Sequence, residues 1–115
     1  MPTVAELLAG VRERCMALPG VTEGVTHGAP TWYVRRRSFA KFVDPAEHRL
    51  EERSVAFWAA APPGARLELP AADPEVFFEP RFGGSDWIGM RLDVRPDGPD
   101  WDEVREILTD AHRQR

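Results

Sequence analysis

Apolar residues recur at helical spacing near both ends of the chain. They fall at Val4, Leu7, Leu8, Val11 and Cys15, and again at Trp101, Val104, Ile107, Leu108 and Ala111. Steps of three and four residues place such a set on one face of a helix. The pattern therefore predicts amphipathic helices over residues 3–18 and 100–112.

Both predicted helices begin with a capping-box pattern. Thr3 precedes Glu6 by three residues, and Asp100 precedes Glu103 by the same spacing. In such a box the first side chain accepts a hydrogen bond from an unpaired backbone N–H of the first turn, and the second side chain reaches back. The first helix ends at a Pro-Gly step, because proline cannot continue a helix and glycine tolerates the left-handed turn.

Between these helices the apolar residues form short aromatic and β-branched runs. The runs predict strands over residues 31–34, 38–43, 55–59, 76–79 and 87–94. In the last run every second residue from Ile88 to Val94 is apolar, so this set should face a core. Residues 64–75 are ambiguous: Ala65, Leu67 and Leu69 alternate as in a strand, but the alanine content and the Asp-Pro-Glu step at 73–75 favour a short helix followed by a helical turn.

This order of elements predicts an α+β fold. Two amphipathic helices need an apolar surface to cover, and one face of an antiparallel sheet supplies it. The other face of the sheet then stays open, as antiparallel sheets allow. The chain has 115 residues, and its Pro and Gly clusters lie too close together for two separate cores. We therefore expect a single domain over residues 1–115.

The composition, 43% apolar and 30% charged, is typical of a globular protein and excludes a disordered chain. No apolar run approaches the roughly 20 residues of a membrane span, and the first residues lack a secretory signal pattern. A cytoplasmic protein without a membrane partner is expected. Cys15 is the only cysteine, so it forms no internal disulfide. Its place on an apolar helical face predicts a buried, inert thiol.

Several segments resemble a known family. The runs LPGVTE at 18–23, HGAPTW at 27–32 and FA at 39–40 resemble the N-terminal half of MmcQ/YjbR-like proteins. The run GSDWIGMRLD at 84–93, followed by WDEV at 101–104, resembles that family's C-terminal signature. The resemblance implies the YjbR/CyaY-like fold of bacterial frataxin, a curved antiparallel sheet with both terminal helices on one face. It also implies DNA binding through a double-wing arrangement.

The chain departs from that family pattern in two places. Where the family typically has Gly-Gly and a basic residue at a hairpin turn, this chain has Arg35-Arg36-Arg37. A type I′ turn needs positive φ, which arginine disfavours, so a longer or differently shaped turn is expected. The first helix also balances its two glutamates with two arginines, so it lacks the acidic ridge that frataxin-type iron binding would need.

Charge is distributed unevenly along the chain. The net charge of −4 excludes a uniformly basic nucleic-acid binder. Residues 35–41 nevertheless hold four bases and no acid, whereas residues 97–110 hold six acids and one base. The planar guanidinium of arginine suits bidentate contacts with phosphates. The predicted nucleic-acid contacts are Arg35, Arg36, Arg37, Lys41, Arg81, Arg91 and Trp87.

Each of these features has a structural alternative. The arginine cluster is either a wing that contacts phosphates or a solvated turn that keeps a strand edge soluble. By alternation the open sheet face should show Tyr33, Trp58 and Trp87 between cations, which suits stacking on bases. The tryptophans could instead pack on neighbouring side chains or on a partner. The glycine-rich loop at residues 83–85 is either a plain loop before a strand or a second wing.

The sequence shows no pattern of an enzyme, a metal site or a cofactor site. His27, His48 and His112 are far apart, without the close ligand pair of a typical metal site. The serines lack a nucleophile elbow. We therefore predict a non-enzymatic MmcQ/YjbR-like protein that binds DNA, without cofactor or metal. The alternative is a module that binds a protein, a small ligand or a second copy of itself.

Overall fold

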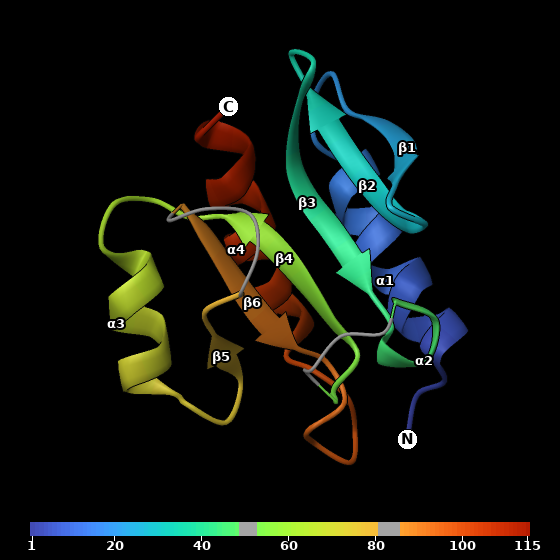
Figure 1. Ribbon diagram of the computed structural model, residues 1–115, viewed down its shortest axis with the longest axis vertical. Coiled ribbons are helices and arrows are strands. Elements are labelled where there is room, and N and C mark those ends of the chain that lie inside the picture. Colours follow the sequence, from blue (N-terminus) through green and yellow to red (C-terminus); the bar gives the residue numbers. More distant parts are fainter. Residues whose placement is uncertain (49–52, 81–85) are drawn as a thin grey trace.

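In the residues that the structure describes, 1–48, 53–80 and 86–115, one antiparallel sheet is combined with helices. This computed structural model runs in the order α1 (Val4–Met16), β1 (Thr22–Thr26), β2 (Ala29–Val34), β3 (Arg37–Val43), α2 (Pro45–His48), β4 (Ala56–Ala60), α3 (Ala65–Ala72), β5 (Phe77–Phe78), β6 (Trp87–Arg91) and α4 (Trp101–Arg113). The strands pair in the order β1-β2-β3-β4-β6-β5, as Figure 1 shows.

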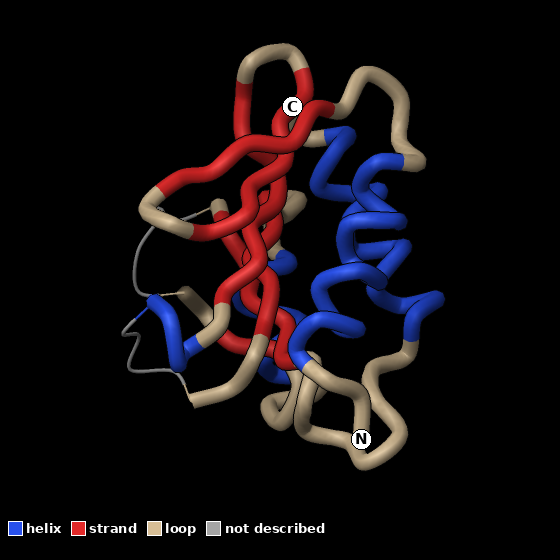
Figure 2. The backbone as a smooth tube through the Cα atoms, turned by 90° about the vertical axis from the view of Figure 1, so that its right-hand side faces the viewer, coloured by secondary structure: helices blue, strands red, loops and turns tan. Residues whose placement is uncertain are grey.

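Helices α1 and α4 pack against each other and cover the same face of the sheet (Figure 2). Both predicted helices and the predicted α+β arrangement are thereby confirmed. The core contains Leu7, Val11 and Cys15 of α1 and Val104, Leu108 and Ala111 of α4, and from the sheet it contains Trp32, Phe39, Phe42, Phe57, Ile88 and Met90. Helix α3 packs beside β5 and β6, at the end of the sheet away from α1 (Figure 1).

The first capping box is present as predicted, and the second is present in part. Thr3 Oγ1 accepts a hydrogen bond from the backbone N–H of Glu6 at 3.1 Å, and Glu6 accepts one from the backbone N–H of Thr3 at 3.2 Å. Asp100 accepts bonds from the backbone N–H groups of Asp102 and Glu103 at 3.0 and 3.2 Å. The side chain of Glu103 instead lines a groove between α4 and α3.

Two tight hairpins join the first three strands. His27 and Gly28 turn between β1 and β2 with φ of 52° and 80°, and Arg35 and Arg36 turn between β2 and β3 with φ of 50° and 65°. Two central residues with positive φ are the mark of a type I′ turn, whose twist matches that of the flanking strands. The expectation of a longer turn at the arginines is therefore wrong, because the paired strands on both sides impose the tight geometry.

Strand β1 was not predicted from the sequence. It is a short edge strand that contains Gly24, and its Val25 is 72% exposed, so no apolar alternation marks it. Its pairing with β2 and the bonds of Glu23 to its neighbours hold it in the sheet. A strand of this kind is defined by its partners rather than by its own residues.

Other boundaries shift by small amounts. The predicted strand over 87–94 ends at Arg91 in β6, although Leu92 stays buried and still donates its N–H to the carbonyl of Val55. The helix predicted within 64–75 is α3, and the strand predicted over 76–79 is the two-residue β5. The single turn α2 was not predicted, and the side chain of Asp44 accepts a bond from the backbone N–H of Ala46 at its start.

Candidate nucleic-acid interface

The sheet face turned away from α1 and α4, here called the outer face, carries a second apolar cluster. Its members are Val43, Ala56 and Trp58, with Phe78 and Trp87 packed against them. Because side chains alternate along a strand, this cluster lies opposite the main core. The strand register places Lys41, Trp58, Gly89 and Phe78 in one row across the outer face.

Trp58 lies at the centre of that row. Its side chain is part of the sheet's packing, since the residue is only 9% exposed. The ammonium of Lys41 lies 5.8 Å from the centroid of its ring, within the range of a cation–π contact. Within the described part of the chain, the indole N–H of Trp58 is buried without a hydrogen-bond partner. The outer face thus combines a cation with an aromatic ring and an unused donor.

Arg91, one of the predicted contacts, is engaged in the fold. A Cβ atom on Gly89 would lie 2.3 Å from Phe78 Cζ, so the Phe78 ring occupies the space that this glycine leaves. The guanidinium of Arg91 lies 4.7 Å from the centroid of the same ring. It also donates to the carbonyls of Pro74 and Glu75, each at 3.1 Å. Arg91 therefore ties β6 to the segment before β5.

Trp87, another predicted contact, is half-buried next to the end of α4. The guanidinium of Arg115 lies 5.5 Å from the centroid of its ring. The Arg115 side chain is 8% exposed, donates to the carbonyl of Ser38 at 2.9 Å and pairs with Asp86 at 3.2 Å. The sequence gives no signal for this role, because an arginine after a helix normally points into solvent.

The three arginines at the β2–β3 turn, Arg35, Arg36 and Arg37, are called the arginine turn below. All three are exposed. Among the described residues, none of them makes an ion pair or a side-chain hydrogen bond. Lys41, on β3, likewise has no carboxylate within ion-pair distance among these residues, and its partial burial lowers the pKa of its ammonium. The hairpin therefore presents cations without counter-ions.

Arginines elsewhere are mostly neutralised by nearby acids. The pairs are Arg12–Glu23, Arg66–Glu79, Arg95–Asp73, Arg105–Asp102, Arg113–Asp110 and Arg115–Asp86. An arginine held by a carboxylate must break that contact to bind a phosphate. The β2–β3 hairpin thus gathers four cations that have no acidic partner among the described residues, although the whole chain is acidic.

Some predicted features contribute little or lie outside the described residues. Arg81 and the loop at 83–85 fall outside them. Burial raises the pKa of the Cys15 thiol well above its usual range, which keeps the group protonated and unreactive. His112 contacts the carbonyl of Pro19 at 2.8 Å, and the exposed His27 forms a turn.

Neither a metal-binding cluster nor a membrane-spanning helix occurs among the described residues. In residues 1–48, 53–80 and 86–115, no three His, Cys, Asp or Glu side chains gather closely enough to hold a metal ion. Helices in these same ranges are all too short or too polar to cross a bilayer.

Comparison with known proteins places this architecture in a family. The crystal structure of Deinococcus radiodurans protein DR2400, with the family-model domain DUF419, superposes with a TM-score of 0.66 at 19% sequence identity. The match covers 97% of this chain and 77% of that one, and it shows a shared fold. No curated protein sequence matches the chain. A family model described as YjbR matches residues 16–114, nearly the whole chain, and the protein therefore belongs to the YjbR family.

Proposed function

We propose that this YjbR-family protein is a non-enzymatic DNA-binding protein whose β2–β3 hairpin contacts the phosphate backbone. The observation that carries the proposal is the contrast in charge pairing. Arg35, Arg36, Arg37 and Lys41 have no acidic partner among the described residues, whereas six arginines elsewhere do. Unpaired guanidinium groups on a protruding hairpin suit bidentate contacts to phosphate oxygens.

The backbone of the turn supports the same proposal. Arg35 and Arg36 both have positive φ, a conformation that glycine or asparagine adopts at lower cost. Strain of this kind costs of the order of 1 kcal/mol per residue and is often found at functional sites. The two residues that the turn would favour carry no charge. A role for the charge explains why arginine occupies both positions.

The outer face supplies the second part of the interface. Lys41 lies on β3, four residues after Arg37, and the register places it opposite Trp58 on the outer face. A DNA backbone that passes the arginine turn could therefore continue along the sheet toward the Lys41–Trp58 pair. With three or four phosphates neutralised, the logarithm of the binding constant should fall against the logarithm of salt concentration with a slope near −3.

Fluorescence anisotropy of a labelled duplex, titrated with the protein over a salt series, tests this proposal. The informative variant is Arg35→Asn with Arg36→Gly, which removes two charges and installs residues that the turn prefers. Its salt slope should become shallower by about 2. The matched control is Arg105→Gln with Arg113→Gln, which removes the same charge from exposed positions on α4.

The control separates a local site from an effect of total charge. The proposal predicts that the α4 variant keeps the salt slope of the unmodified protein. If the two double variants weaken DNA binding equally, the hairpin is not part of the interface. An absence of binding to duplex and single-stranded DNA at low salt, up to about 100 µM protein, would overturn the proposed function itself.

A further inference from the structure

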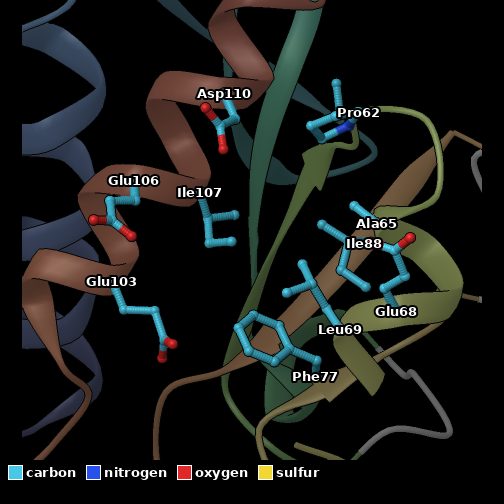
Figure 3. A pocket seen from close by; sticks show the side chains of 11 residues that line it. Pro62, Ala65, Glu68, Leu69, Phe77, Ile88, Glu103, Glu106, Ile107 and Asp110 are labelled. Carbon is cyan, nitrogen blue, oxygen red and sulfur yellow. The ribbon is translucent and has the colours of Figure 1, made fainter. Parts of the chain in front are cut away.

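A groove with a volume of about 240 Å³ lies between α3 and α4, far along the sheet from β1. Its floor is apolar and consists of Ala60 at the end of β4, Phe77 of β5 and Ile88 of β6. Leu69 of α3 and Ile107 of α4 extend the apolar lining up the two walls. Figure 3 shows the side chains of Phe77, Ile88, Leu69 and Ile107 facing this space.

The groove is rimmed by carboxylates. Glu103, Glu106 and Asp110 come from α4 and Glu68 comes from α3, and among the described residues no basic side chain lines the groove. Asp110 pairs with Arg113 at 3.7 Å, on the exposed side of α4. Within the described residues, the other three carboxylates make no ion pair. Glu103 points toward Phe77 over the apolar floor (Figure 3).

The carboxylates that α4 contributes to the groove repel one another. Glu103 and Glu106 are three residues apart and Glu106 and Asp110 are four apart, so like charges are neighbours on the surface of α4. Burial raises the pKa of Glu103, and the nearby Asp100 raises it further. A bound cation would relieve this repulsion.

Helix α3, which forms the second wall of the groove, is only partly buried against the sheet. Helix α3 has no fully buried residue, and it packs on β5 and β6 rather than filling the space in front of α4. Its first residue follows Gly64, which makes no side-chain cap, and it contains Pro70. The space between the walls is therefore left open by the packing of the protein itself, and the charge of its rim determines what fits there.

We propose that the groove binds a small organic cation, an ammonium group carried on a short apolar body. The carboxylate of Glu103 complements the charge, and Phe77, Ile88 and Leu69 contact the apolar part. The volume is below the 300–1,000 Å³ of sites for drug-sized ligands, so the ligand is small. This site lies apart from the arginine turn and takes the opposite charge, so it is independent of the proposed DNA binding.

Titration of the ¹⁵N-labelled protein with phenethylammonium, followed by NMR, tests the proposal. We expect saturable shifts of the backbone amides of α3 and of residues 103–110, with a dissociation constant in the millimolar range or below. The neutral analogue 2-phenylethanol should bind at least about fivefold more weakly, and ethylammonium should also bind more weakly because it lacks the apolar body. The anion 3-phenylpropanoate should cause no saturable shift.

Two charge variants on the same helix locate the site. Glu103→Gln keeps the size of the side chain and should weaken phenethylammonium binding about threefold to tenfold. Asp102→Asn removes a neighbouring charge that is 86% exposed and paired with Arg105, and binding should change less than about twofold. Equal affinity for the amine and the alcohol, or equal effects of the two variants, would overturn the proposal. Shifts that map away from α3 and α4 would do the same.

Discussion

Gly10 shows how one residue depends on a contact from the other end of the chain. It lies inside α1, and the ring of Trp101, the first residue of α4, packs directly on it. The guanidinium of Arg14 lies 4.4 Å from the centroid of the same ring and donates to the carbonyl of Gly10 at 3.0 Å. The absent side chain of Gly10 lets the two helices meet at this point.

Gly10→Ala should destabilise the protein by about 1–3 kcal/mol, as overpacking does. In an ordinary helix interior the same change stabilises by up to about 1 kcal/mol. The sign reverses here because a Cβ atom would lie 2.2 Å from Trp101 Cη2. Urea unfolding measures the change.

The control for that prediction is Gly10→Ala made in a variant that lacks the Trp101 ring. In a Trp101→Ala background, Gly10→Ala should become stabilising, because nothing then occupies the space of the new methyl group. A gain in stability on Gly10→Ala with Trp101 in place would show that the helices approach each other differently.

Among the elements of the fold, the arginine turn places charged side chains at two positions whose positive φ favours asparagine or glycine. Arg35→Asn with Arg36→Gly should stabilise the fold by about 1 kcal/mol, because asparagine and glycine adopt positive φ at lower cost. Thermal and urea unfolding measure this gain. Arg37→Asn removes a charge from the first residue of β3 and should change stability by less than about 0.5 kcal/mol. A double variant no more stable than the original protein contradicts a strained turn.

Glu23 fastens the edge strand β1 to its neighbours. Its carboxylate accepts bonds from Arg12 Nε at 2.8 Å and Nη2 at 3.1 Å, and from the indole N–H of Trp32 at 2.8 Å. The hydrogen bonds from Arg12 hold the pKa of Glu23 below its usual value, and the bond from Trp32 lowers it further. One carboxylate thus links α1, β1 and β2.

This lowered pKa gives a pH dependence with a definite sign. Stability from Glu23 is fully present above the pKa of an unfolded glutamate, about 4.3, and is lost as the pH falls through the lower folded-state pKa. Glu23→Gln should reduce the free energy of unfolding by about 1–2 kcal/mol at pH 7 and by less at pH 3. Urea unfolding at both pH values measures this difference.

The exposed Glu13→Gln on α1 is the control for that experiment. Its unfolding free energies should run parallel to those of the unmodified protein across the same pH range. The interpretation fails if Glu23→Gln loses as much stability on acidification as the original protein does. Glu6, whose bonds to Thr3 also lower its pKa, leaves some acid sensitivity in every variant.

At the scale of the whole molecule, Arg115 ties the end of α4 to strands at two distant places in the sequence. Arg115→Ala should destabilise the protein by about 1–3 kcal/mol, since it removes a nearly buried guanidinium with its bonds to Ser38 and Asp86. Urea unfolding measures the change in stability, and tryptophan fluorescence reports the change in the surroundings of Trp87. Arg113→Ala, two residues away and 73% exposed, is the control and should cost under about 0.5 kcal/mol. Equal losses would contradict this role.

Helices α1 and α4 and the buried strands could be predicted because their signals are local. Periods of three to four residues and of two residues are visible in a short window, as is the box of Thr3 and Glu6. Strand β1 and the turn α2 have no such signal and exist because of their neighbours. The turn at Arg35 is tight for a related reason, since the register of β2 and β3 outweighs the preference of arginine.

The order of residues alone specifies the α+β class, the two capped helices and the concentration of cations between residues 35 and 41. Each of these properties depends on residues that are close together in the chain, so the sequence shows it directly. Only the tertiary structure decided which cations are available. It binds Arg91 to the carbonyls of Pro74 and Glu75 and buries Arg115 beside Trp87, while it leaves the arginine turn exposed. Ion pairs such as Arg12–Glu23 and Arg115–Asp86 join residues distant in the chain, so their presence follows from packing and not from composition.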